Sequence, residues 1–76
     1  MATKGLSRGI RVLNLDNNHI KNKGAKTIAG FMTNSRSLIM LSLGNNMIEL
    51  TGIQALGQAL ICKSKLKYLS LASNPI

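Results

Sequence analysis

The chain has 76 residues, enough for one small domain that would bury only about 60% of its unfolded surface. Its residues are 45% hydrophobic but only 3% aromatic, which indicates a globular chain with an aliphatic core rather than a disordered one. A single cysteine excludes an internal disulfide, and no apolar stretch approaches the roughly 18 residues of a membrane span.

The first segment, MATKGLSRGI, has no apolar run of the kind found in secretory signals. We interpret residues 1–9 as a poorly ordered leader. Small secreted domains usually need disulfides, which this chain cannot form. The sequence therefore predicts an intracellular, cytoplasmic location.

The first predicted structural unit spans residues 10–37. It opens with IRVLNLDNNHI, in which alternating aliphatic residues predict a short strand followed by a turn. Spacings of three and four then indicate a helix of about ten residues with one apolar stripe. That stripe contains Gly24, Ala25, Ile28, Ala29 and Met32. The polar segment TNSRS at 33–37 predicts a loop back to the next strand.

The same pattern returns twice, at a period of 28 residues (from 10 to 38 and from 38 to 66). The second unit is predicted over 38–65, and a third, over 66–76, contains only a strand and a turn. The matching positions are Ile10, Leu13, Leu15, Asn18 and Ile20; Leu38, Leu41, Leu43, Asn46 and Ile48; and Leu66, Leu69, Leu71, Asn74 and Ile76. Such a period is typical of a repeat protein.

The helix starts carry weaker signals. Asn22 and Thr51 are predicted N-caps of the two helices, although they do not align in the repeat. Gly24 and Gly52 share one repeat position. We expect the helix to pack closely against the neighbouring strand there, because a side chain would push it away.

Strands joined through helices pair in parallel with right-handed crossovers. Strands stack about 4.8 Å apart while helices need about 8–10 Å, so the layers must bend with the helices outside. The repeated asparagine, at positions 18, 46 and 74, follows each strand where the chain turns. An amide both donates and accepts, so we expect Asn18, Asn46 and Asn74 to form a ladder that pairs with backbone groups inside the turns.

This pattern resembles leucine-rich repeat proteins. The 28-residue length and the glycine at each helix start are similar to the ribonuclease-inhibitor-like subclass, as in NOD-like receptor arrays. The resemblance covers residues 10–76 and implies an α/β fold, a right-handed horseshoe with parallel strands inside and helices outside. It also implies that partner binding depends on variable surface positions.

Residues that alternate with the buried leucines are predicted to face the concave side of the horseshoe. Tyr68 is the strongest candidate for an anchor, because tyrosine is enriched among binding hot spots. The predicted partner-binding residues are Val12, Asn14, Asp16, Met40, Ser42, Tyr68 and Ser70. For any single one of them, an ordinary strand-surface role is the competing interpretation.

The net charge of +8 raises the question of a nucleic-acid partner. The cations are predicted to ring the edges and the convex side rather than to line a groove. Outside the leader, they are Arg11 and Lys67 beside the strands, Lys21, Lys23 and Lys26 at the first helix start, and Arg36, Lys63 and Lys65 in the return loops. We therefore expect solvated repeat surface, with nucleic-acid contact through this basic rim as an alternative.

No catalytic or metal site is predicted. His19 lies at a variable turn position, and Cys62 is expected to be a lone thiol at a helix end. Asp16 and Glu49 belong to different turns and are not expected to form a catalytic pair. We accordingly expect neither an enzyme nor a cofactor.

The sequence favours a protein-interaction scaffold whose concave face binds another protein of unknown identity. A fragment of a Ran-type GTPase-activating protein is the alternative, for which Arg11 is the only strand-flanking arginine. Repeats need neighbours and caps, so we expect a piece of a longer array, weakly stable alone and prone to self-association through its open ends.

Overall fold

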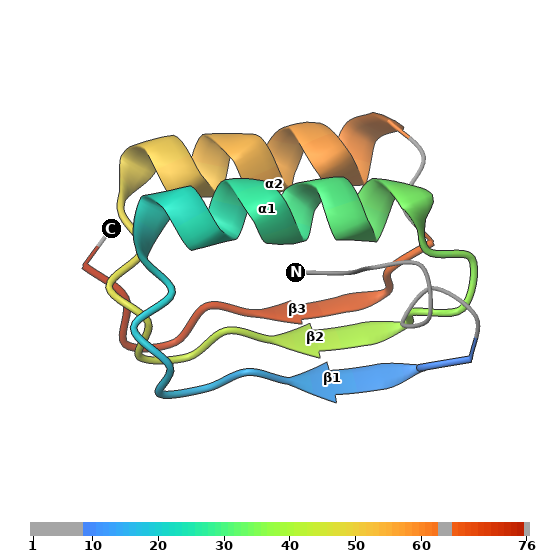
Figure 1. Ribbon diagram of the computed structural model, residues 1–76, viewed down its shortest axis with the longest axis horizontal. Coiled ribbons are helices and arrows are strands. Elements are labelled where there is room, and N and C mark those ends of the chain that lie inside the picture. The colour runs from blue at the N-terminus through green and yellow to red at the C-terminus, as the bar shows by residue number, and fades with distance from the viewer. Residues whose placement is uncertain (1–8, 63–64, 76) are drawn as a thin grey trace.

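The computed structural model describes residues 9–62 and 65–75. Five elements follow one another as β1 (Val12–Asn14), α1 (Lys21–Asn34), β2 (Met40–Ser42), α2 (Leu50–Cys62) and β3 (Tyr68–Ser70). The strands form one layer and the helices a second layer above it (Figure 1). Except for Gly9, the predicted leader lies outside the described residues, as do the predicted positions of Lys63 and Ile76.

The three strands form one parallel sheet in the order β1-β2-β3, which confirms the predicted parallel pairing. Its register joins equivalent repeat positions, so Val12 lies beside Met40 and Met40 beside Tyr68. The backbone pairing continues past the strands, where the Leu15 and Leu43 N–H groups donate to the carbonyls of Ser42 and Ser70 at 2.9 and 2.8 Å. Each repeat is therefore bonded to the next along most of the strand and turn.

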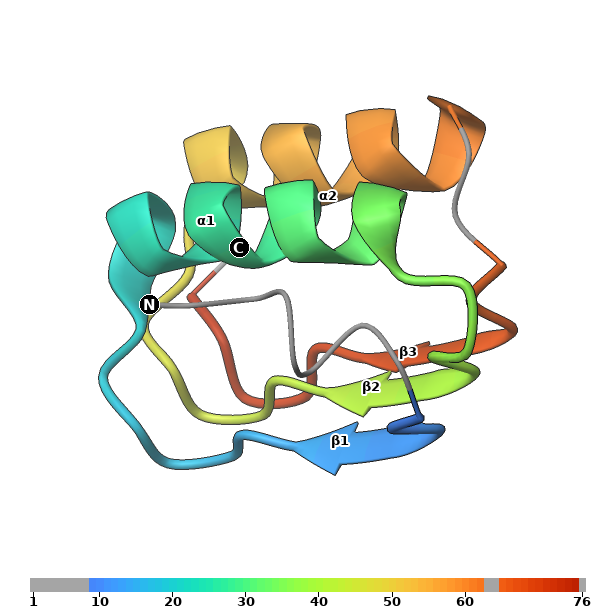
Figure 2. The same ribbon diagram turned by 45° about the vertical axis from the view of Figure 1, so that its right-hand side comes forward.

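The chain crosses between the layers at two opposite edges of the sheet (Figure 2). We call the side that follows the strands the turn edge, formed by residues 15–20, 43–49 and 71–75. The side that precedes them is the return edge, formed by 9–11, 35–39 and 65–67. Side chains at the turn edge are thus separated from those at the return edge by the length of a strand.

Both helices are longer than the predicted ten residues, with 14 residues in α1 and 13 in α2. In α1 the apolar stripe continues through Phe31, which is buried. The helix ends at Ser35, whose N–H donates to the carbonyls of Phe31 and Met32, and whose hydroxyl accepts the Leu38 N–H at 3.1 Å. In the described part of the chain, no helix is long and apolar enough to cross a membrane.

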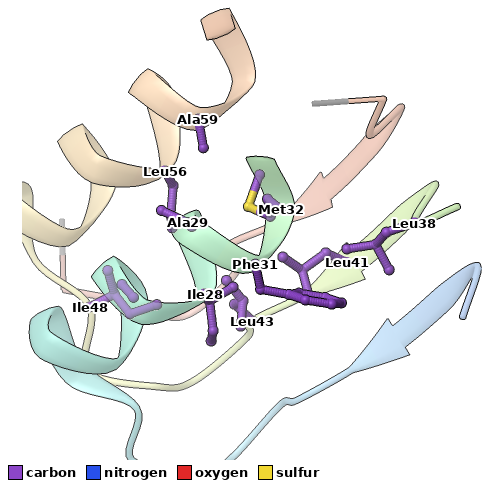
Figure 3. Packing of buried hydrophobic residues seen from close by; sticks show 11 residues of the cluster. Ile28, Ala29, Phe31, Met32, Leu38, Leu41, Leu43, Ile48, Leu56 and Ala59 are labelled. Atoms are coloured by element: carbon purple, nitrogen blue, oxygen red, sulfur yellow. The ribbon is translucent and has the colours of Figure 1, made fainter. Parts of the chain in front are cut away.

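The core fills the space between the helices and the sheet (Figure 3). The fully enclosed aliphatic side chains of the middle repeat, Leu41, Leu43 and Ile48, are each 0% exposed. Phe31 extends from α1 toward the strands and lies beside Leu41, and Leu56 extends from α2 toward Ala29 of α1. Burial of a leucine, isoleucine or phenylalanine stabilises the fold by about 1.5–3 kcal/mol each, so these few residues dominate the packing.

The two predicted N-caps are wrong. Asn22 lies inside α1, whose N-cap residue Ile20 makes no side-chain cap, and Thr51 lies inside α2. The Asn22 side chain instead caps the neighbouring helix, because its Oδ1 accepts the Glu49 and Gly52 N–H groups at 2.8 and 3.0 Å. Parallel packing of α1 against α2 brings the first turn of one helix beside the first turn of the next.

The predicted packing partner of Gly24 and Gly52, a neighbouring strand, is also wrong. A Cβ at Gly24 would lie 2.5 Å from Ile20 Cγ2, and one at Gly52 would lie 2.6 Å from Ile48 Cγ2. The close contact is therefore with the isoleucine that precedes the helix, not with a strand. At Gly52 the same Cβ would also lie 2.7 Å from the capping oxygen of Asn22.

Candidate functional site

The inner bend of the middle repeat is closed by Asn46, which is 0% exposed. Its Oδ1 accepts the N–H groups of Asn18 and Ile20 at 2.7 and 3.4 Å. Its Nδ2 donates to the carbonyls of Leu15 and Gly44 at 2.9 and 3.1 Å. The amide thus bonds its own turn and the preceding one, and a buried backbone group left without a partner costs about 1–3 kcal/mol.

The same arrangement recurs one repeat later. Asn74 Oδ1 accepts the Asn46 and Ile48 N–H groups at 2.9 and 3.0 Å, and its Nδ2 donates to the Leu43 carbonyl at 2.8 Å. The Asn18 amide donates only within its own turn, to the carbonyls of Leu15 and Asp16. Asn46 and Asn74 therefore each bond back to the preceding turn, whereas Asn18 has no described turn before it.

The backbone of the turn edge is left-handed at repeated positions. Asn17, Asn45 and Ser73 have φ values of 62°, 54° and 60°, and His19 and Met47 have φ values of 50° and 58°. Asparagine tolerates this region well, whereas methionine does not. His19 therefore lies at a turn position with left-handed backbone geometry, and its side chain is exposed.

The sheet has one face covered by the helices and one open face (Figures 1 and 2). Val12, Met40 and Tyr68 lie side by side on the open face, and they are 63%, 40% and 61% exposed. We call these three residues the apolar column. Met40 and Tyr68 also line a shallow hollow together with Ser42, Lys67 and Ser70.

The polar candidates beside the apolar column differ in how many hydrogen bonds they already make within the chain. The Asp16 carboxylate accepts the Ser42 hydroxyl at 2.6 Å and the Gly44 N–H at 2.7 Å. Asn14 Oδ1 accepts the Asp16 N–H at 2.9 Å. Asp16 and Ser42 therefore bind one repeat to the next and have less capacity for a partner. Ser70 is exposed at the end of β3.

Four of the cations lie at an edge of the sheet, as predicted, but they also line a shallow groove there, which was not predicted. Arg11, Arg36, Lys65 and Lys67 line one groove at the return edge, together with Ser37 and Ile39. The backbone explains this, because the Arg11 carbonyl accepts the Ile39 N–H and the Ile39 carbonyl accepts the Lys67 N–H, both at 2.8 Å. We call this feature the basic groove. The sequence signal for it was the shared repeat position of Arg11, Ile39 and Lys67.

The described residues bring together no group of three His, Cys, Asp or Glu side chains that could hold a metal ion. Asp16 and Glu49 both lie at the turn edge, but Asp16 bonds Ser42 and Gly44 while Glu49 contacts Asn22 at 3.4 Å. They do not face one another as an acid–base pair. The thiol of Cys62 lies outside the described side chains.

A family model described as Leucine Rich repeat matches residues 8–29. This match supports a leucine-rich repeat protein. The matched segment covers β1, its turn and the first part of α1, and the strand register pairs the equivalent positions of the 28-residue repeat in β2 and β3. Searches of curated proteins and of solved structures found no match.

Leucine-rich repeats generally mediate protein–protein interaction and are typically binding modules rather than enzymes. That tendency agrees with a site that consists of an open strand surface and a charged edge. Among the described residues, this arrangement offers contact area and charge.

Proposed function

We propose that the chain is part of a right-handed leucine-rich-repeat horseshoe of the ribonuclease-inhibitor-like subclass, and that its concave face binds another protein in the cytoplasm. The open face of the sheet becomes the concave face in this proposal. The 28-residue offset between paired asparagines supports the subclass, as do the two-layer arrangement and the helix in each complete repeat.

The apolar column carries this proposal. Val12, Met40 and Tyr68 belong to the exposed large hydrophobic residues described, and they lie in one row across three paired strands. The leucine that directly follows each of them lies on the other side of the sheet and packs into the core beneath the helices. A row of exposed apolar side chains beside small polar ones is the composition of an interface with an apolar centre and a polar rim.

The open face also has the rigidity that recognition requires. Hydrogen bonds fix the strands in register, and Asp16 and the asparagine amides hold the turns that follow. A partner would meet a surface formed before binding, which lowers the entropy cost of association.

A photo-crosslinking experiment tests the proposal. A photoreactive phenylalanine analogue replaces Tyr68 on the open face, and the matched control carries it at Gln58, an exposed residue of α2. We expect Tyr68-dependent capture of a partner protein in cytoplasmic extract. The purified partner should then lose about tenfold or more in affinity for Tyr68→Ala, because tyrosine anchors often cost at least 1.4 kcal/mol on truncation.

Equal capture from both positions, or unchanged affinity of the purified partner for Tyr68→Ala and Met40→Ala, would contradict the proposal. Ile61→Ala serves as the affinity control, because Ile61 is 80% exposed on α2, a helix of the layer on the other side of the sheet from the open face. Circular dichroism on each variant separates loss of binding from loss of structure.

A further inference from the structure

The basic groove at the return edge has no described carboxylate to balance it. Asp16 and Glu49 lie at the turn edge, where they bond Gly44 and Asn22 respectively. Five residues of extended chain separate Arg11 from Asp16, which is roughly 16 Å. Charges that far apart in solvent are largely screened, because the Debye length is about 8 Å at physiological salt. The groove therefore presents a local excess of positive charge.

The helix ends account for only part of this charge. Arg36 and Lys65 follow the C-termini of α1 and α2, where a helix dipole favours cations. Arg11 and Lys67 precede strands instead, and both are exposed. Among the described residues, no hydrogen bond or ion pair involves the Arg11 or Lys67 side chain, so both charges are available to a ligand.

The basic groove is continuous with the open face. Lys67 lines both the groove and the hollow that contains Met40 and Tyr68. Arg11, Ile39 and Lys67 each directly precede one member of the apolar column in the chain. Two rows therefore cross the strands at neighbouring positions, one of Val12, Met40 and Tyr68 on the open face and one of cation, apolar residue and cation at the return-edge rim of that face.

The spacing of these rows matches an α-helix laid across the strands. Neighbouring strands are about 4.8 Å apart, and one turn of an α-helix rises about 5.4 Å. Across three strands the mismatch totals about 1.2 Å, which flexible arginine and lysine side chains absorb. A helix in this place would present one side chain per turn to each row.

We propose that the partner of the concave face is a protein helix with an apolar stripe and an acidic flank. The stripe packs on the apolar column, and carboxylates two turns apart bind Arg11 and Lys67 on either side of Ile39. This inference rests on the proposed function and adds the chemistry of the partner. Binding of an amphipathic helix by its apolar face is a common mode of peptide recognition.

A protein helix fits these rows better than a nucleic acid does. No aromatic residue lines the basic groove, and base stacking on aromatic side chains is a main source of affinity for single strands. The centre of the groove is Ile39, a half-buried apolar residue that has no counterpart on a phosphate backbone. The adjacent apolar column calls for apolar side chains in the ligand.

The test uses the full chain and a synthetic alanine-based helical peptide that carries leucine once per turn and glutamate on the adjacent flank. Two further probes have lysine in place of the glutamates or serine in place of the leucines, and a fourth is an oligothymidine. Fluorescence anisotropy gives the affinity of each. We expect the glutamate–leucine peptide to bind most tightly, with its affinity falling as salt is added.

The protein variants then locate the contact. Arg11→Glu with Lys67→Glu should weaken binding of the glutamate–leucine peptide about tenfold or more. Lys23→Glu with Lys26→Glu makes the same change in net charge on exposed positions of α1 and should change it by less than about twofold. If circular dichroism shows that the groove variant has lost structure, Arg11→Gln with Lys67→Gln replaces it, with an expected loss of about threefold.

Equal losses in the groove and α1 variants would overturn the inference, and the proposed function would survive if Tyr68→Ala still weakened binding. A loss in the groove variant with none in Tyr68→Ala would overturn both. The inference also fails if the lysine–leucine or glutamate–serine peptide binds as well as the glutamate–leucine one. Tighter binding of oligothymidine with the same dependence on Arg11 and Lys67 would assign the groove to nucleic acid.

Discussion

The middle repeat and the two repeats that flank it have the same consensus residues in different surroundings. In the middle repeat, Leu41, Leu43, Asn46 and Ile48 are each 0% exposed. Their counterparts in the first repeat are half-buried at Leu13, Leu15 and Ile20 and exposed at Asn18. Those in the third repeat, Leu69, Leu71 and Asn74, are half-buried.

This difference shows that the place of a residue within its repeat does not by itself determine how deeply the residue is buried. Leu41 is enclosed because β1 and β3 pair on either side of β2, whereas Leu13 and Leu69 have a described strand on one side only. The hydrogen bonds follow the same rule, since Asn46 bonds the turn before it and is bonded by the turn after it. Stability in such an array is a sum of repeat terms and neighbour terms.

The largest expected change in unfolding free energy comes from replacing equivalent leucines in the middle and first repeats. Leu41→Ala should destabilise the chain by about 3–5 kcal/mol, because the cavity opens where no side chain can relax into it. Leu13→Ala, the matched change in the first repeat, should cost about 1–2 kcal/mol, because solvent already reaches that site. Urea unfolding followed by circular dichroism gives both free energies, and equal costs would refute the neighbour explanation.

The second effect concerns the asparagines. Asn46→Ala removes the acceptor of the Asn18 and Ile20 N–H groups and one of the two donors to the Leu15 carbonyl, so we expect a loss of about 2–3 kcal/mol. Asn18→Ala removes only bonds within an exposed turn and should cost about 0.5 kcal/mol. The same urea titrations measure them. A larger loss for Asn18→Ala would reverse the assigned roles.

The third effect tests the cap that one helix provides to the next. Asn22→Ala should cost about 1 kcal/mol, because it leaves the Glu49 and Gly52 N–H groups without their acceptor. Asn34→Ala is the control, since the exposed Asn34 amide donates to the Gly30 carbonyl within its own helix. We expect that change to cost less than about 0.5 kcal/mol. Thermal unfolding of the two variants at matched concentration compares them, and identical transitions would show that the cross-helix cap contributes nothing.

The smallest effect has the opposite sign. Met47 is half exposed and has a φ of 58°, so Met47→Asn should stabilise the chain by about 0.5 kcal/mol through relief of backbone strain. Met40→Asn, on a strand with ordinary geometry, should be neutral or destabilising because asparagine is unfavourable in strands. A higher melting temperature for Met40→Asn than for Met47→Asn would contradict the strain argument.

The periodic features were accessible from the sequence. Parallel strands over the leucine phrases follow from spacing alone, because leucine and asparagine recur wherever the same contact recurs. Residues that do not recur were missed. Phe31 is buried where the next repeat has Ala59, and Ser35, which is 3% exposed, aligns with a lysine.

Contacts between repeats were the hardest to predict. Asn22 looked like a cap for its own helix, but its acceptor oxygen bonds N–H groups 27 and 30 residues away. Asp16 looked like a free surface carboxylate, but it bonds Gly44, where a side chain would be crowded by Asp16 itself and by the Ala72 carbonyl. Likewise, the basic groove depends on strand pairing, which places Arg11, Ile39 and Lys67 in one row.

The central claim is that the Asn46 side-chain amide closes the inner bend between two neighbouring turns. Hydrogen exchange of side-chain amides, followed by NMR in the intact chain, tests it most directly, with the exposed Asn18 amide as the internal reference. The Asn46 amide should exchange about a hundredfold or more slowly than that of Asn18, because its exchange requires the repeats to separate. Equal, rapid exchange at both asparagines would contradict it.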